Sequence, residues 1–294
     1  MHPLSPRRVL DTALGFRGAR ALLCAAELGV FTELAHGPRT ARQLCRTLGL
    51  DAATATDLLD ALVAMALLDR EADDAQAVYV STREAAQYLD QRSPAYLGAA
   101  LALAGRDYAA WTGLAAALKA APTSSFSTRR AAGDGNPYAH LFPALASGYD
   151  FSLHQAVGYV DAAGEQLAGA LRQHHPALRV SRFDGASSAF PGVDSLVLVG
   201  ELGPRDAAAR LEMLRRARTA LRAGGCLISV EPLIDDARRS RLGALLASLA
   251  ARLESGGGGG FTGTQFDAWC RASGFADTTT LPLDADCSAA IARV

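Results

Sequence analysis

The spacing of apolar residues changes about halfway along the chain. In the first half they recur every three or four residues, and this periodicity predicts amphipathic helices. Two short segments, 68–70 and 77–80, are a possible strand pair between the last two helices. Helix, turn, helix and strand pair in this order are typical of a winged-helix module. The predicted helices cover residues 9–30, 40–48, 52–67 and 83–119.

The second half alternates short apolar runs with helical patterns, which is typical of an α/β domain with a parallel sheet. The chain therefore divides into a helical part (1–120), a connector or lid (121–152) and an α/β part (153–294). The predicted strands of the α/β part are 156–160, 178–183, 195–199 and 226–230, with a closing pair near 278–283 and 287–293. Its predicted helices are 165–174, 205–221, 238–254 and 264–273.

The charges on the second winged-helix helix argue against DNA binding. This helix carries Asp51, Asp57 and Asp60 and has no Lys or Arg before Arg70. A helix that enters a DNA groove needs donors to phosphates and base edges. We therefore predict that the module packs or dimerises. The alanine-rich helices that follow suit close helix approach, so we expect an apolar dimer interface within residues 9–120.

Composition limits the classes of binding partner and the cellular location that can be expected for this chain. The 29 Lys+Arg residues balance 30 Asp+Glu residues, so there is no electrostatic case for nucleic acid or an anionic membrane. The five cysteines show no CxxC spacing and are expected to be buried free thiols, and no metal site is predicted. The N-terminus lacks a long apolar segment and no run reaches membrane-span length, so a cytoplasmic location is expected.

Residues 156–167, AVGYVDAAGEQL, have the frame of a nucleotide-binding loop without its glycines. An apolar strand leads to Asp161, and a helical pattern begins at Glu165. In a doubly wound domain this junction carries several glycines, which let the backbone approach the ligand at the helix N-terminus. Here only Gly164 is present, and Glu165 brings an anionic side chain to the place of a bound carboxylate or phosphate. The sequence predicts a disabled loop.

Several segments together resemble one protein family. They are ELGVFTELAHGPRTARQLCRTLGLD (27–51), the junction YDFS…YVDAAG (149–164), HPALRVSRFD (175–184), RRARTALRAGGCLISVE (215–231) and FTGTQFDAWCRASGF (261–275). The chain resembles the bacterial S-adenosylmethionine (SAM)-dependent O-methyltransferases of the acetylserotonin and caffeate type. The resemblance implies an N-terminal winged-helix dimerisation domain, followed by a shortened Rossmann-like class I methyltransferase domain.

This chain departs from the family pattern at three places. The DxGGGxG motif keeps only Asp161 and Gly164. Only residues 185–193 separate Asp184 from Asp194, where the family has a helix, a strand and a Gly-Asp turn that wall the adenine. A helical crossover alone needs about a dozen residues, so this strand is predicted to be missing. The family's catalytic His aligns with Gly203, which cannot accept a proton.

The resemblance assigns the remaining site residues. Asp184 stands where the ribose diol is bound, although Asp at a strand end is also a common turn residue. Asp161, Gly164 and Asp184 together form a vestigial set of cofactor-binding residues, called below the vestigial cofactor set. Glu231 ends a central strand, near the Glu with which similar enzymes orient their base, and His140 and His154 are placed in the acceptor cleft. These three are the predicted catalytic residues.

Two classes of function follow. In the first, the protein belongs to bacterial natural-product metabolism and has lost autonomous methyl transfer. It then acts as the partner subunit of a complete methyltransferase-like homologue, or as a SAM-independent enzyme of cyclisation type, and no cofactor is expected. In the second, it is a SAM-dependent O-methyltransferase of a small-molecule hydroxyl with divergent motifs. The dimer is homomeric or heteromeric in either case.

Overall fold

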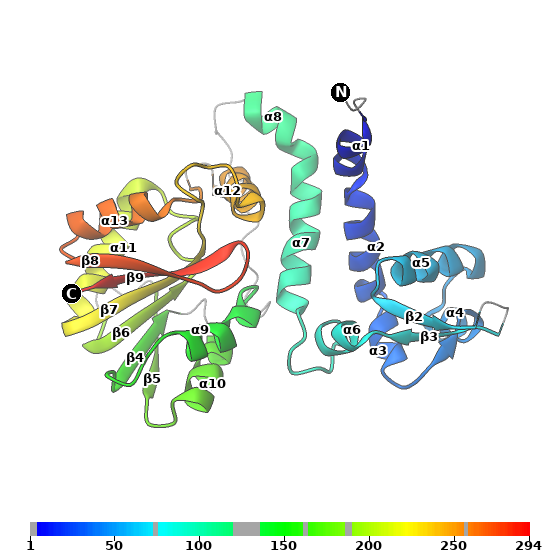
Figure 1. The fold of residues 1–294 in the computed structure, drawn as a ribbon, viewed down its shortest axis with the longest axis horizontal. Helices are drawn as coiled ribbons and strands as arrows, with labels where there is room; N and C mark the ends of the chain where they lie inside the picture. The colour runs from blue at the N-terminus through cyan, green and yellow to red at the C-terminus, as the bar shows by residue number, and fades with distance from the viewer. Residues whose placement is uncertain (1–4, 73–75, 120–135, 161–163, 186–189, 256–257) are drawn as a thin grey trace. The chain divides into compact units, whose positions relative to one another are not determined.

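The computed structural model describes residues 5–72, 76–119, 136–160, 164–185, 190–255 and 258–294. The chain forms two compact units, residues 1–105 and 106–294 (Figure 1). Among the helices described, none is long and apolar enough to cross a membrane.

The first unit has the predicted winged-helix order. A three-stranded antiparallel sheet has the order β1-β3-β2; β1 precedes the helix-turn-helix of α4 and α5 and contacts α4, and β2 and β3 follow it, with β2 in contact with α5. The strands are β1 (Arg39–Thr40), β2 (Leu68–Glu71) and β3 (Val78–Ser81). The helices are α1 (Arg7–Leu14), α2 (Phe16–Glu27), α3 (Val30–Leu34), α4 (Ala41–Leu48), α5 (Ala52–Ala64) and α6 (Arg83–Tyr88), and α7 (Gly98–Ala110) runs across the boundary between the units.

Capping residues set the helix ends in this unit. The helix predicted over 9–30 is divided at Gly15 and Gly29, and Gly29 has a φ of 76°. Gly49 ends α4 in the left-handed conformation, which glycine adopts without a steric cost. The Asp51 carboxylate then accepts from the Thr54 N–H at 3.0 Å and begins α5. The Asp51 carboxylate therefore has a structural role as the N-cap of α5.

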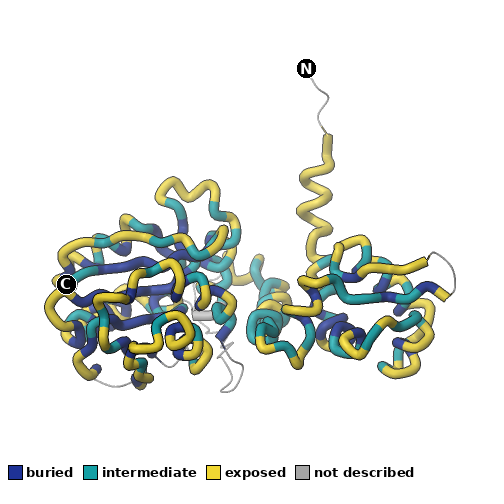
Figure 2. Tube along the Cα trace, turned by 60° about the horizontal axis from the view of Figure 1, so that its bottom comes forward, coloured by how far each residue is buried: buried dark blue, intermediate teal, exposed yellow. Residues whose placement is uncertain are grey.

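The core of the first unit leaves helix α1 uncovered. Phe31, Leu44 and Leu62 are buried among α2–α5 and the small sheet. By contrast, no residue of α1 or α7 is buried, and α1 is exposed along its length (Figure 2). The exposed side chains include Val9, Leu10, Leu14 and Phe16.

The second unit is built on a six-stranded mixed sheet in the order β5-β4-β6-β7-β9-β8. The four strands β4 to β7 are parallel, and β9 and β8 close the sheet in antiparallel fashion. The strands are β4 (Ala156–Val160), β5 (Arg179–Phe183), β6 (Val193–Val199), β7 (Leu221–Pro232), β8 (Asp277–Pro282) and β9 (Cys287–Arg293). This is the predicted shortened Rossmann-like architecture.

Helices pack on both faces of this sheet. Successive residues of β6 point to opposite faces: Val197 and Val199 join the core beneath α9 and α10, and Leu196 and Leu198 join the core beneath α11 and α13. The helices are α8 (Leu114–Lys119), α9 (Phe142–Gly148), α10 (Gly164–His174), α11 (Ala207–Ala220), α12 (Leu242–Ser255) and α13 (Gly263–Ala272), with short 3₁₀ turns η1 (Trp111–Gly113) and η2 (Ala139–Leu141).

Part of the range predicted as a connector belongs to this core. Leu141, Phe142 and Leu145 of η2 and α9 are buried against the sheet, and α9 contacts α10. The helical pattern is only two turns long, which is why the periodicity does not reveal it. Most of the Ser- and Gly-rich stretch 122–136 lies outside the described residues.

In the part of the chain that the structure describes, β5 is the edge strand, and no helix or strand lies between β5 and β6. The return segment instead places the Phe190 ring parallel to the Phe183 ring, with 5.7 Å between centroids. The Arg216 guanidinium lies 4.6 Å from the Phe190 centroid and donates to the Gly185 carbonyl at 3.1 Å. The predicted loss of a strand in this region is confirmed by the sheet order.

Candidate functional site

The carboxyl ends of the parallel strands meet at one edge of the sheet. Val160 pairs with Phe183, and Val199 pairs with Val230, so β4 to β7 end side by side. Open α/β sheets bind ligands outside this edge. The residues that follow these strands therefore define the first candidate site.

Glu231 is the buried titratable group at this edge. Glu231 is only 2% exposed. Its Oε1 accepts a hydrogen bond from the Leu202 N–H at 2.8 Å and another from the Ser229 hydroxyl at 3.3 Å. Burial raises the pKa of this carboxyl to about 7. Glu231 can therefore give or take a proton near neutral pH, which is the property of an acid–base group.

Gly203 lies directly beside Glu231. A Cβ built on Gly203 would be 3.4 Å from Glu231 Oε2, so a side chain at this position would start against the carboxyl group. The Gly203 carbonyl accepts from the Gly259 N–H at 2.8 Å, which fixes the backbone here. The position that aligns with the family's base is thus next to Glu231, and it carries no side chain.

Arg210 holds the loop that contains Gly203. This residue of α11 is 8% exposed, and its guanidinium donates to the carbonyls of Leu202 at 3.0 Å, Arg205 at 3.0 Å and Gly259 at 3.1 Å. It also lies 4.3 Å from the centroid of the Trp269 ring. Sequence reasoning missed this residue. The sequence did contain a sign of it, because Arg210 lies three residues before Met213 and so falls on the face of the helix that carries the apolar residues.

The vestigial cofactor set is only partly described. Gly164 begins α10 with a φ of 64°, a conformation that favours glycine, and Asp184 is exposed just after β5. Asp161 lies outside the described residues. The Tyr159 hydroxyl donates to Glu165 Oε1 at 3.2 Å, which keeps a carboxylate at the first turn of α10.

Comparisons with known proteins now decide the family. The model of the O-methyltransferase dimerisation domain matches residues 10–91. The tetracenomycin polyketide synthesis 8-O-methyltransferase TcmO of Streptomyces glaucescens is 30% identical over 340 aligned residues, which cover 99% of this chain and 98% of TcmO. The chain belongs to the SAM-dependent O-methyltransferase family.

One further relative has a similar sequence, and one solved structure has a similar fold. The 3-hydroxy-5-methyl-1-naphthoate 3-O-methyltransferase of Streptomyces sahachiroi is 26% identical over 319 residues, 94% of this chain and 91% of that protein. Human N-acetylserotonin methyltransferase, solved with SAM, shares the fold with a TM-score of 0.87 at 22% identity, over 99% of this chain and 98% of that chain. The alignment with TcmO is longer than the 294 residues of this chain, so this member lacks segments of its relative.

In this O-methyltransferase family member, His140 lies in η2, near the carboxyl edge. The neighbouring Tyr138 ring comes within 2.8 Å of a Cβ built on Gly200, which follows β6. His140 Nε2 is 3.7 Å from Asp284 Oδ2, and its Nδ1 is 3.2 Å from the Pro137 carbonyl. The ring thus contacts Asp284 rather than Glu231.

His154 lies at the opposite edge of the sheet. It precedes β4 by two residues, and its ring contacts the Ser195 hydroxyl near the start of β6 and the Tyr149 hydroxyl at 3.3 Å. The structure therefore does not bring His154 together with Glu231, because the length of the parallel strands separates them. A residue just before a parallel strand lies at the amino-terminal edge, and this rule could have placed His154 from the sequence.

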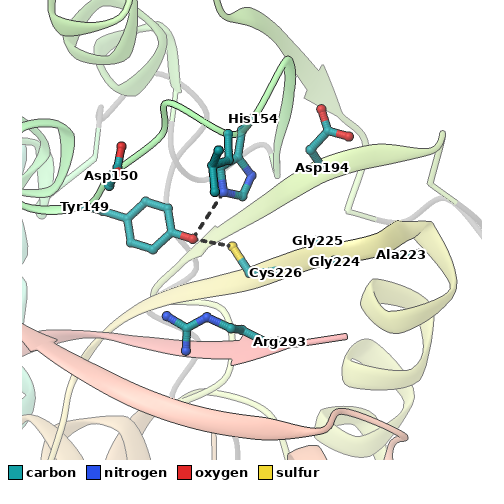
Figure 3. A pocket seen from close by; sticks show the side chains of 10 residues that line it. Tyr149, Asp150, His154, Asp194, Ala223, Gly224, Gly225, Cys226 and Arg293 are labelled. Atoms are coloured by element: carbon teal, nitrogen blue, oxygen red, sulfur yellow. Dashed lines mark hydrogen bonds between the residues drawn. The ribbon is translucent and has the colours of Figure 1, made fainter.

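His154 lines a pocket of about 290 Å³ at this amino-terminal edge (Figure 3). Tyr149, Cys226 and Arg293 lie around it, and the Tyr149 hydroxyl is 3.1 Å from Cys226 Sγ. Burial lowers the pKa of His154. No cluster that could hold a metal ion occurs among the described residues. All five cysteines are free, and four are buried.

Proposed function

We propose that this O-methyltransferase family member has lost autonomous methyl transfer. We propose further that it acts in bacterial natural-product metabolism as the partner subunit of a complete methyltransferase-like homologue. The observation that carries this proposal is the edge position of β5. The family's adenine wall follows this strand, and here the chain returns to β6 through a short segment covered by Phe190.

The described residues at the loop do not fit SAM by themselves. The cofactor's carboxylate belongs at the first turn of α10, where Glu165 already places a carboxylate held by Tyr159. Arg172 is 3.9 Å from Glu165 and half exposed, so it neutralises this charge only weakly. The Glu165 side chain is itself 79% exposed, so solvent screens its charge and the repulsion of a bound carboxylate is modest.

The absent base supports the same proposal. Transfer to a hydroxyl requires removal of its proton, and the residue at the base position is Gly203. Glu231 has a suitable pKa but is 2% exposed and accepts the Leu202 N–H and the Ser229 hydroxyl. In the subunit proposal, Glu231 supports the 202–205 loop, and the partner supplies both cofactor and base.

The dimerisation domain has an exposed apolar surface to which the proposed partner can bind. Residues 10–91 match that domain, and the exposed apolar side chains of α1 and the start of α2 lie at one end of it. An amphipathic helix whose apolar side chains are exposed within its own chain is typical of a subunit interface. The proposed occupant is a longer homologue that carries the intact glycine motif.

A second function, SAM-dependent O-methylation of a small-molecule hydroxyl by this chain alone, is favoured by the comparison with TcmO. The similarity extends over 99% of this chain. Gly164 also keeps the left-handed conformation at the start of α10. In that case Gly164 and Asp184 would contact SAM.

Calorimetric titration of the purified chain with SAM separates the two functions. The subunit proposal expects no micromolar site, since a binding free energy of about −8 kcal/mol requires a formed pocket. Affinity purification from the native host should recover a longer homologue, and adding it should restore both SAM binding and methyl transfer. A micromolar site together with turnover by the isolated chain would overturn the proposal.

A further inference from the structure

We propose that the pocket at the amino-terminal edge of the sheet binds a small planar carboxylate, such as a benzoate-sized acid. It lies at the opposite ends of the strands from Glu231, so it is independent of the methyltransferase site. Its volume of about 290 Å³ is near the lower end of ligand pockets, which run from roughly 300 to 1,000 Å³.

Aromatic side chains form a rigid wall of this pocket. The Tyr149 hydroxyl meets both His154 Nε2 at 3.3 Å and Cys226 Sγ at 3.1 Å, and His154 also contacts Ser195. Behind them, Phe151 packs edge-on against Tyr149 with 4.7 Å between ring centroids. The polar atoms of the wall thus satisfy one another, and the phenol and imidazole rings are held in place for a ligand ring.

The opposite side of the pocket is bare backbone. Gly224 and Gly225 line it, and a Cβ built on Gly224 would meet no atom within 4 Å, so the space beside this glycine is open. A flat ligand can approach this glycine turn more closely than it could approach side chains. The exposed Leu153 adds an apolar rim.

Arg293 supplies the charge that selects a carboxylate. Its Nη1 is 3.4 Å from both Asp277 Oδ2 and Thr279 Oγ1, and the Arg293 and Asp277 side chains are about half exposed (Figure 3 shows Arg293 beside Tyr149 and Cys226). Such long, solvated contacts contribute little, so a ligand can compete for the guanidinium. A guanidinium offers two parallel N–H donors, the geometry that a carboxylate accepts.

Two carboxylates also line the pocket, and neither is placed to repel the ligand strongly. Asp194 accepts from the Gln155 and Ala156 N–H groups at 2.8 Å and pairs with Arg222 at 3.0 Å. Asp150 accepts from the Ser152 N–H at 2.9 Å and faces solvent, where its charge is screened.

The test is a titration of the full chain with benzoate, benzyl alcohol and benzylamine, followed by amide NMR. We expect benzoate to bind with a millimolar dissociation constant, shifting Gly224 and Gly225, and the other two probes to bind at least about tenfold more weakly. Arg293→Gln should weaken benzoate binding by about tenfold or more, and Arg293→Lys by less. Arg271→Gln is the matched control, because Arg271 is an exposed arginine outside the pocket lining whose guanidinium pairs with the Asp267 carboxylate at 2.8 Å.

Three outcomes would overturn the proposal. The first is the absence of pocket shifts with benzoate up to about 20 mM, a concentration well above a millimolar dissociation constant. The second is benzylamine binding as tightly as benzoate, which would assign the pocket to cations through Asp150. The third is unchanged benzoate affinity in Arg293→Lys and Arg293→Gln. Circular dichroism establishes that each variant is folded, and Arg293→Lys tests the geometry even if the glutamine variant does not fold.

Discussion

The buried carboxyl of Glu231 makes the stability of the second unit depend on pH in a defined direction. The pKa of Glu231 is raised from its ordinary 4.5 to about 7 in the folded chain. A raised carboxyl pKa means that the fold favours the protonated form. Its contribution to stability is therefore fully present below pH 4.5 and is lost as the pH rises to 7. Because Glu231 is almost completely buried, solvent screening does not reduce this effect.

The expected magnitude follows from the size of the shift. Each pKa unit corresponds to about 1.4 kcal/mol, so the native state loses roughly 3 kcal/mol at Glu231 between pH 4.5 and pH 7. Glu231→Gln keeps an oxygen that can accept the Leu202 N–H and removes the ionisation. The variant should therefore gain stability relative to the natural chain as the pH rises, by about that amount.

Urea unfolding of both proteins between pH 4.5 and 8 measures this difference. Both tryptophans, Trp111 and Trp269, belong to the second unit, so their fluorescence reports its unfolding. Glu212→Gln, on the exposed face of α11, controls for the general effect of removing a carboxylate. A stability difference between Glu231→Gln and the natural chain that does not change with pH would refute the reasoning.

Three other substitutions test the packing. Arg210→Leu leaves carbonyls of the 202–205 loop without donors and should lower the free energy of unfolding, measured in urea, by about 3 to 5 kcal/mol. The control Arg215→Leu, at an exposed position of α11, should lower it by less than about 1 kcal/mol. Equal losses in the two variants would contradict the role of Arg210 in holding this loop. Gly158→Ala puts a Cβ into the Phe183 ring and should lower stability by about 1–3 kcal/mol; an unchanged melting temperature would count against it. Leu10→Glu should weaken the dimer at least about tenfold in sedimentation equilibrium without unfolding the chain, and Arg8→Ala should not; a dimer unaffected by Leu10→Glu would exclude α1 from the interface.

Local pattern predicted most of the architecture, because most elements have a helical or apolar pattern and several helices, such as α4, α5 and α13, begin at a capping side chain. Asp51 before α5 and the apolar run 195–199 in β6 are examples that need no tertiary information. The short return between β5 and β6 could also be predicted, since chain length alone forbids a helical crossover there.

The site was predicted less completely, since it depends on contacts between distant segments. The Arg210 clamp joins residues about fifty positions apart, and no local pattern reports such a contact. The pocket around Arg293 needs the antiparallel register of β7 and β9, which places Arg293 opposite Cys226. Glu231 was found because it ends a parallel strand, and the same rule, applied to strand beginnings, separates His154 from it.

The uncovered helix α1 has a consequence for the life of the protein in the cell. An N-terminal helix without a single buried residue opens at little cost, and proteases cleave segments that open in this way. In the proposed assembly the partner covers this helix, so cleavage within α1 should be slower in the complex than in the isolated chain.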